Sequence, residues 1–255
     1  MNFDIFIPVR LDSSRLPKKA LLQISKIPIL KILVDRLSNA KKIRNIVVCT
    51  TTLPSDDELV NFLQKNNIKY FRGSEKDILQ RYLDAATTFN SDYIVNVDGD
   101  DIYTDPKSID DIVEEYIKNK TDFIKISSVP LGLQSFGFPI HILKQICKNK
   151  NSDDTETGWI RFFTESNLIS KGEAIQNLEN QFPNNLRLSL DYPEDFEIAK
   201  EIFSSISKNF DLEELSIFLN NNSNILKAIR NTEDKWKNHW KTNLSDISTK
   251  TNEIK

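Results

Sequence analysis

The sequence predicts an α/β protein in which a mostly parallel sheet is covered by helices on both faces. Two observations carry this prediction. Throughout residues 3–127, short apolar runs alternate with segments whose apolar side chains recur at helical spacing. The chain has 255 residues, a length that suits one α/β domain, with or without a small appended subdomain, and allows a sizeable core.

The first half of this alternation covers three strands. Apolar runs predict strands at residues 3–8, 46–50 and 68–71. The first is followed by a helix over residues 29–40, whose apolar face comprises Leu30, Leu33, Val34 and Leu37. Between the second and third strands, Ser55 and Glu58 form a capping-box pattern that opens a helix with Leu59, Phe62 and Leu63 on its inner face.

The rhythm continues through two more strands. Ser74 with Asp77 is expected to cap a helix whose apolar positions are Ile78, Leu79, Tyr82, Leu83 and Ala86. A strand is predicted at residues 93–97. The pair Asp105-Pro106 then gives a helix N-cap followed by proline at the first helical position. Residues 123–127 read as the fifth strand.

After Ser128 the pattern changes, because residues 129–140 are rich in proline, glycine and aromatic side chains. We interpret 129–183 as an inserted arm that contains a short helix near 157–167. The alternating leucines of 186–190 predict a strand that returns to the main sheet, with helices following from Pro193 and a break at 220–224. The polar tail, 241–255, is expected to pack weakly or lie on the surface, and residues 1–240 to form a single domain.

The loop after the first strand carries the first chemical signal. Pro8, Arg10, Ser13, Arg15 and Lys19 lie between the first strand and the first helix. Open α/β sheets bind ligands at the carboxyl ends of their strands, and arginine offers forked donors to phosphate oxygens. The loop therefore predicts a polyphosphate site. A solvated basic loop is the alternative.

Two groups of carboxylates follow later strands. Asp98, Asp100 and Asp101 come directly after the strand at 93–97, and three carboxylates at a strand end suit Mg²⁺. Further on, Arg187, Ser189 and Asp191 share one face of the strand expected there, and that face needs water or a ligand. An ordinary turn and a half-exposed strand are the respective alternatives, since Asp and Gly are frequent in turns.

These segments together resemble the cytidylyltransferases. The pattern I-P-A-R-x-x-S-x-R-L-P-x-K of the 3-deoxy-manno-octulosonate and acylneuraminate enzymes, and of the spore coat polysaccharide biosynthesis protein F group, is matched here by Arg10, Ser13, Arg15, Leu16, Pro17 and Lys19. Relatives in this family usually have glycine where this chain has Lys18 and Lys26, which predicts a less pliable loop. The resemblance covers residues 3–205 and is weakest in the arm.

The resemblance implies a Rossmann-like, three-layer nucleotide-diphospho-sugar transferase fold. It also implies that Asp100 and Asp191 hold Mg²⁺. The segment that contains Asp191, residues 187–195, resembles the family pattern R-L-x-L-D-x-P-E-D. A third match, F-R-G-S-x-x-D-V-L-x-R-Y at residues 71–82, makes Ser74 and Arg81 candidate contacts to cytosine or ribose. Thr50, Thr51 and Thr52 either border the base pocket or are ordinary threonines at a strand end.

The implied reaction is transfer of a cytidylyl group from CTP to an acceptor, with release of pyrophosphate. Arg10, Arg15 and Lys19 would neutralise the triphosphate, and Asp98 would join the residues that bind the nucleotide. An anionic acceptor is predicted, with Arg187 and Arg161 as candidate contacts. For Arg161, an ion pair with Glu165 is an equal alternative. The arm is expected to build the acceptor pocket and a homodimer contact.

Composition and charge narrow the partners. The net charge of −3 argues against a nucleic-acid binder, and the local concentration of cations predicts a small anion. We expect a cytoplasmic protein without a membrane segment. Two other classes stay open. The Asp98-Gly99-Asp100 triplet is also found in metal-dependent glycosyltransferases, against which the cationic loop argues. A non-catalytic nucleotide-binding protein is the second alternative, against which the paired metal carboxylates argue.

Overall fold

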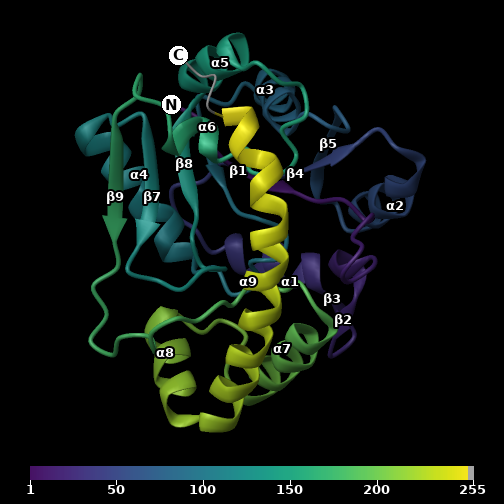
Figure 1. The fold of residues 1–255 in the computed structure, drawn as a ribbon, viewed down its shortest axis with the longest axis vertical. Helices are drawn as coiled ribbons and strands as arrows, with labels where there is room; N and C mark the ends of the chain where they lie inside the picture. Colours follow the sequence, from purple (N-terminus) through teal and green to yellow (C-terminus); the bar gives the residue numbers. More distant parts are fainter. Residues whose placement is uncertain (252–255) are drawn as a thin grey trace.

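A seven-stranded sheet forms the centre of the molecule in the computed structural model, which describes residues 1–251, with side chains as far as Asn238. The strands lie in the order β5-β4-β1-β6-β8-β7-β9 (Figure 1). They are β1 (Phe3–Pro8), β4 (Asn45–Thr51), β5 (Lys69–Gly73), β6 (Tyr93–Asn96), β7 (Phe123–Ser127), β8 (Phe136–Pro139) and β9 (Lys171–Ile175). All neighbours pair in parallel except β8, which is antiparallel to both β6 and β7. The predicted α/β fold is confirmed.

Helices cover both faces of the sheet because β1 alternates its side chains between two cores. Ile5 and Ile7 pack with helices α1 (Ile29–Leu37), α2 (Asp57–Lys65) and α4 (Pro106–Asn119). Phe6 packs on the opposite face with α3 (Ile78–Phe89), α5 (Ile140–Asn149) and α6 (Arg161–Thr164). The N-cap predicted for α4 is confirmed, since the Asp105 carboxylate accepts a hydrogen bond from an N–H of the first turn. For α3, Asp77 of the predicted pair is the N-cap, and Ser74 accepts a hydrogen bond from the Asp77 N–H ahead of the helix.

A third core joins the C-terminal helices to the rest of the molecule. It contains α7 (Pro193–Ser205), α8 (Leu212–Asn221) and the first turns of α9 (Ser223–Thr251). Leu186, Leu188 and Leu190 pack into this core and do not form a sheet strand, in contrast to the prediction. Their alternation reflects the layer of helices that packs against one side of this segment. Within residues 1–251, the segment forms one isolated β-bridge, between Arg187 and Leu131.

The range 129–183 also differs from the inserted arm that the sequence predicted. It supplies β8, which lies between β6 and β7, and β9, which forms the edge of the sheet beyond β7. A β-carbon at Gly137 in β8 would lie 2.4 Å from the Tyr93 hydroxyl of β6, so only glycine fits this close approach. Strand β8 has only four residues, two of which are glycine and proline, so the sequence shows too little alternation to predict a strand there.

The capping box predicted at Ser55 and Glu58 is wrong. A 3₁₀ turn, η2 (Pro54–Asp56), precedes α2 instead, and the Asp56 side chain does not cap the helix. The buried Asp56 carboxylate accepts hydrogen bonds from the Leu11 N–H at 2.8 Å and from the Thr51 hydroxyl. Asp56 therefore anchors the cationic loop, a task that local helix signals do not indicate.

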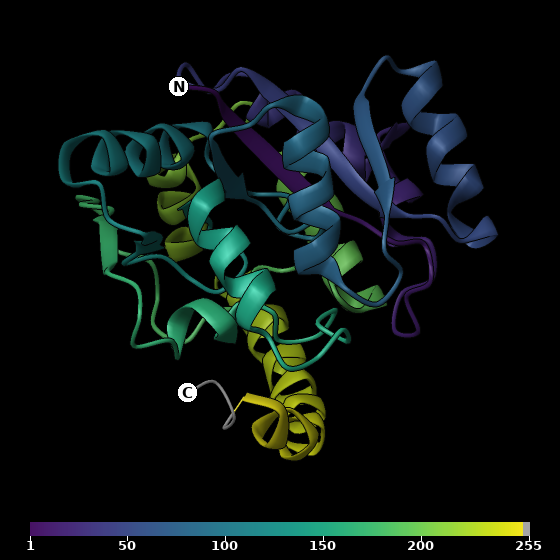
Figure 2. The ribbon, with the colours of Figure 1, turned by 90° about the horizontal axis from the view of Figure 1, so that it is seen from above.

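Helix α9 extends as one long element across the front of the molecule (Figure 1) and forms a ridge on one side when seen from above (Figure 2). The predicted break at 220–224 is confirmed, since α8 ends at Asn221 and α9 begins at Ser223. Side chains from His239 onward lie outside the described residues, as does the predicted packing of the tail 241–255. Among the residues described, no helix has the length and hydrophobicity that a membrane crossing requires.

A short hairpin follows the cationic loop, formed by β2 (Gln23–Ile24) and β3 (Ile27–Pro28). Its two turn residues, Ser25 and Lys26, have φ angles of 49° and 68°, and Lys18 has a φ angle of 52°. Such positive angles at both turn residues are typical of the tight hairpin turn that favours Asn-Gly. Lys18 and Lys26 thus keep a left-handed backbone conformation to which glycine is better suited.

Replacing Lys26 with glycine is therefore expected to stabilise the protein. Left-handed backbone disfavours an L side chain, so the free energy of unfolding should rise by about 0.5–1 kcal/mol after the entropy of glycine in the unfolded chain is subtracted. Chemical denaturation measures the change. The matched control is Lys144→Gly at an exposed position inside α5, which should lower stability by about 0.5–1 kcal/mol. A loss of stability in both variants would contradict the strain argument.

Candidate functional site

A cleft of about 650 Å³ lies at the carboxyl ends of β1 and β6. The chain runs from β1 to β4 on one side, and β6 lies on the other side of β1. Such a reversal of strand order opens a crevice in parallel sheets, where their ligands bind. The cleft is lined by the loops after both strands, by residues of 131–136 and 156–160, by Ser189 and Asp191, and by Trp236 of α9.

The cationic loop lines this cleft at every predicted position, namely Pro8, Arg10, Ser13, Arg15 and Lys19. Besides the anchor at Asp56, the loop is closed by its own hydrogen bonds, in which the Lys18 N–H donates to the Leu11 carbonyl at 3.2 Å and the Leu16 N–H to the Ser13 hydroxyl at 3.3 Å. Each cationic side chain has a carboxylate partner. Arg10 pairs with Glu156 at 3.0 Å, Arg15 with Asp191 at 2.6 Å, and Lys19 with Asp100.

Three carboxylates gather at the end of β6. Asp98, Asp100 and Asp101 each place an oxygen within 4.8 Å of the others. A β-carbon at Gly99 would lie 2.7 Å from the Val9 side chain, so the loop packs directly against the end of β1. Burial, followed by the charge of Asp100, raises the pKa of Asp98 to about 6. Burial and the charges of Asp100 and Asp98 raise the pKa of Asp101 well above its usual range.

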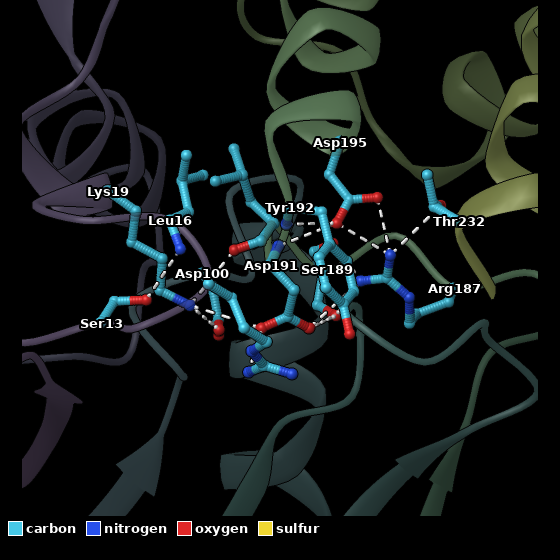
Figure 3. A network of polar contacts seen from close by, with 12 residues as sticks. Ser13, Leu16, Lys19, Asp100, Arg187, Ser189, Asp191, Tyr192, Asp195 and Thr232 are labelled. Carbon is cyan, nitrogen blue, oxygen red and sulfur yellow. Dashed lines mark hydrogen bonds and ion pairs between the residues drawn. The ribbon is translucent and has the colours of Figure 1, made fainter. Parts of the chain in front are cut away.

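This donor set fits a hard divalent cation. Each of these crowded, partly buried carboxylates disfavours the ionised form of its neighbours. Mg²⁺ prefers oxygen ligands of this kind. Asp191 is not part of the cluster among the described residues. The structure brings Asp191 close to Asp100 through Lys19, whose ammonium contacts Asp100 and lies 3.6 Å from Asp191 (Figure 3). Burial lowers the pKa of Lys19, but the charges of Asp100 and Asp191 outweigh it and the pKa is raised.

Arg187 has a different place from the acceptor contact that was predicted. Its side chain is 1% exposed and does not line the cleft. The guanidinium donates to both oxygens of Asp195, at 2.6 and 2.8 Å, to Asp191 at 3.2 Å, and to the Thr232 hydroxyl of α9 at 3.2 Å (Figure 3). Arg187 thus holds Asp191 in position from behind, and both terminal nitrogens of its guanidinium are used inside the protein.

Ser74, Arg81 and Arg161 also lie outside the cleft lining. The fully buried Arg81 donates to the carbonyls of Ser74 and Glu75 and pairs with Glu156 at 2.7 Å. Ser74 accepts a hydrogen bond from the Asp77 N–H at 3.1 Å. Arg161 pairs with Glu165 at 2.5 Å, the alternative that helical spacing indicated. Of the three threonines 50–52, none lines the cleft, and Thr51 instead supports Asp56.

Sequence reasoning missed Glu156 and Trp236. Glu156 lines the cleft and joins Arg10, a cleft residue, to the buried Arg81. The backbone N–H of Glu156 donates to the Lys76 carbonyl at 3.1 Å, which fixes its loop against the start of α3. No local pattern around residue 156 signals this role, because both partners lie far away in the sequence. Trp236 was missed because it lies beyond residues 3–205, the range that the family resemblance covers.

Comparisons with known proteins agree with this geometry. A family model described as cytidylyltransferase matches residues 5–230. Spore coat polysaccharide biosynthesis protein SpsF of Bacillus subtilis is 26% identical over 230 residues, which cover 87% of this chain and 96% of SpsF. An uncharacterized protein of Methanocaldococcus jannaschii is 30% identical over 230 residues, with coverage of 90% and 95%.

Among solved structures, a cytidylyltransferase from Leptospira borgpetersenii superimposes with a TM-score of 0.79 at 30% identity. The match covers 88% of this chain and 96% of that one. The family match spans the cationic loop, the aspartate cluster and Asp191 in one continuous range. This chain therefore belongs to the cytidylyltransferase family and is a nucleotidyltransferase.

Proposed function

We propose that this enzyme transfers a cytidylyl group from CTP to an anionic sugar, or to a related acid or phosphate, and releases pyrophosphate. The observation that carries the proposal is the pairing of opposite charges across one cleft. In the loop after β1, Lys19 pairs with Asp100 at the end of β6, Arg15 with Asp191, and Arg10 with Glu156. The similarity to SpsF supports a role in the synthesis of cell-surface glycans.

The protein's part in the reaction is positioning and charge stabilisation. Arg10, Arg15 and Lys19 would bind the triphosphate and stabilise the negative charge that grows on the departing pyrophosphate. Each cation now contacts a carboxylate, so binding of the triphosphate exchanges protein partners for phosphate oxygens. The acceptor oxygen would attack the α-phosphorus in line with the bond to pyrophosphate, and that bond breaks as the new one forms.

Mg²⁺ is the proposed cofactor, held by Asp100 with Asp191 and supported by the neighbouring Asp98. When bound it would neutralise phosphate charge and lower the pKa of an acceptor hydroxyl. Release of Lys19 from between Asp100 and Asp191 would open the space between these two carboxylates. The homodimer implied by the family resemblance and the cytoplasmic location expected from the sequence stay predictions.

The anion of the acceptor needs a partner other than Arg187 and Arg161, since neither lines the cleft. The cations that do so among the described residues all belong to the loop after β1. We infer that the charged group of the acceptor lies toward Arg15, Lys19 and the metal, and that the body of the acceptor extends toward the neutral residues of the cleft.

Pyrophosphate release tests the proposed function. The enzyme is assayed with CTP, ATP, GTP or UTP, with and without Mg²⁺, against 3-deoxy-manno-octulosonate, an acylneuraminate, sugar phosphates and phosphonates. We expect release that depends on Mg²⁺ and on the acceptor, with CTP strongly preferred. Equal turnover of GTP or UTP would contradict the cytidylyl assignment. Efficient turnover of an uncharged acceptor would contradict the anionic one.

A further inference from the structure

The neutral part of the cleft is built from three segments that are distant in the sequence. Leu131, Gln134 and Phe136 come from the chain before and within β8, and the neutral residues 157–160 from the loop before α6. Trp236 comes from α9. Apolar surface with a few neutral polar groups is the usual lining of a site for an uncharged portion of a small molecule.

The two tryptophans of this lining differ in their surroundings. Trp159 is 7% exposed, and its ring packs against Tyr82, Phe138 and Phe163 within one of the cores. Trp236 is half-buried and lines the cleft with its more exposed side chain. Its indole is therefore the aromatic surface of the two that the cleft can present to a ligand.

The first turns of α9 hold Trp236 in relation to the reaction centre. Ile225 and Ile229 are 2% exposed in the third core, and Lys235 pairs with Glu194 of α7. Thr232 accepts a hydrogen bond from Arg187, the residue that also donates to Asp191 (Figure 3). Trp236 lies one helical turn, about 6 Å, beyond Thr232 on the same face of α9. One continuous network thus ties the helix that carries Trp236 to Asp191.

We propose that Trp236 determines acceptor specificity by packing its indole against the apolar face of a sugar ring. The neutral side chains of Gln134 and Thr157, which line the same cleft, would hydrogen-bond the hydroxyl groups of that ring. The proposal rests on the proposed cytidylyltransferase reaction and narrows its acceptor. A ring-bearing acidic sugar can use the indole, whereas a small phosphonate without a ring cannot.

The test compares Trp236→Ala and Trp236→Phe with the unmodified enzyme, using whichever compound of the panel above the unmodified enzyme turns over best. Loss of the indole is expected to raise the KM for that acceptor by about tenfold or more, the usual size for one lost apolar contact of this kind. The KM for CTP, the melting temperature and the affinity for CTP measured by calorimetry should stay unchanged, and phenylalanine should restore most of the acceptor affinity. Asp234→Ala is the matched control, because Asp234 is exposed and lies about 200° around α9 from Trp236.

The outcomes separate this inference from the function on which it rests. An unmodified enzyme that turns over an acidic sugar, together with a normal acceptor KM in Trp236→Ala, would overturn the role of Trp236 alone. Equal rises in the KM for CTP and for the acceptor would assign Trp236 to the nucleotide side and overturn the proposal as well. A ringless phosphonate as the best acceptor would also overturn it. An unmodified enzyme that releases pyrophosphate with none of the acceptors would overturn the proposed function, and this inference with it.

Discussion

Replacing Asp100 with asparagine is expected to lower kcat by about 10²-fold or more, because the variant keeps the shape of the side chain and loses one charge beside the reacting phosphates. Asp100 is the carboxylate common to the aspartate cluster and the contact with Lys19. The melting temperature should change little, since the Asp100 side chain is 23% exposed. Pyrophosphate release gives kcat, and thermal unfolding gives the melting temperature.

Asp191→Asn should lower kcat to a similar extent but should also lower the melting temperature. Its carboxylate is 5% exposed and is paired with the buried Arg187, and removing one member of a buried ion pair destabilises the fold. The matched control is Asp12→Asn, at a carboxylate that lines the same cleft outside the cluster, and its kcat should stay close to that of the unmodified enzyme. Near-normal activity in both Asp100→Asn and Asp191→Asn would place the metal site elsewhere.

Replacing Lys19 with methionine should have two effects of opposite sign. Turnover should fall by about 10²-fold or more because a cation that stabilises the departing pyrophosphate is lost. The affinity for Mn²⁺ without nucleotide should rise by about tenfold or more, since the ammonium no longer neutralises the carboxylates of Asp100 and Asp191. Mn²⁺ is a suitable probe because free and bound ions are distinguished by electron paramagnetic resonance.

Lys18→Met is the matched control for this experiment. Lys18 precedes Lys19 directly, but its side chain is 59% exposed and pairs with Glu58 on the surface. Both turnover and Mn²⁺ affinity should stay near those of the unmodified enzyme. Unchanged Mn²⁺ affinity in Lys19→Met would show that the lysine and the metal do not compete for these carboxylates, and that Lys19 acts on the nucleotide alone.

Much of the site follows from local sequence combined with the rule for parallel strands. The cationic loop follows β1 and the aspartate cluster follows β6, and these strands are neighbours in the sheet. Because the carboxyl ends of adjacent parallel strands meet at one edge, the sequence alone placed Arg10, Arg15, Lys19 and the aspartates in one cleft. Asp191 came from the resemblance of its segment, and the structure gives it contacts to Arg15 and Lys19.

The orientation of buried charges was decided by tertiary packing. Strand periodicity placed Arg187, Ser189 and Asp191 on one side of an extended segment, but it does not say which neighbour that side meets. In the fold, α7 and α9 meet Arg187 with Asp195 and Thr232, so its guanidinium is used inside the protein. Arg81 is likewise taken up by Glu156, which lies 75 residues later in the chain.

The sequence by itself therefore determined the fold class, the family and the edge of the sheet at which the candidate site lies, because each of these depends on short-range patterns of residue type. The tertiary structure decided which charges face the cleft and which serve the interior, how β8 entered the sheet, and that α9 brings Trp236 to the site. These features depend on contacts between residues far apart in the chain, such as Arg15 with Asp191 over 176 positions. No periodicity within one segment encodes such contacts, since the packing of all the elements together determines which surfaces meet.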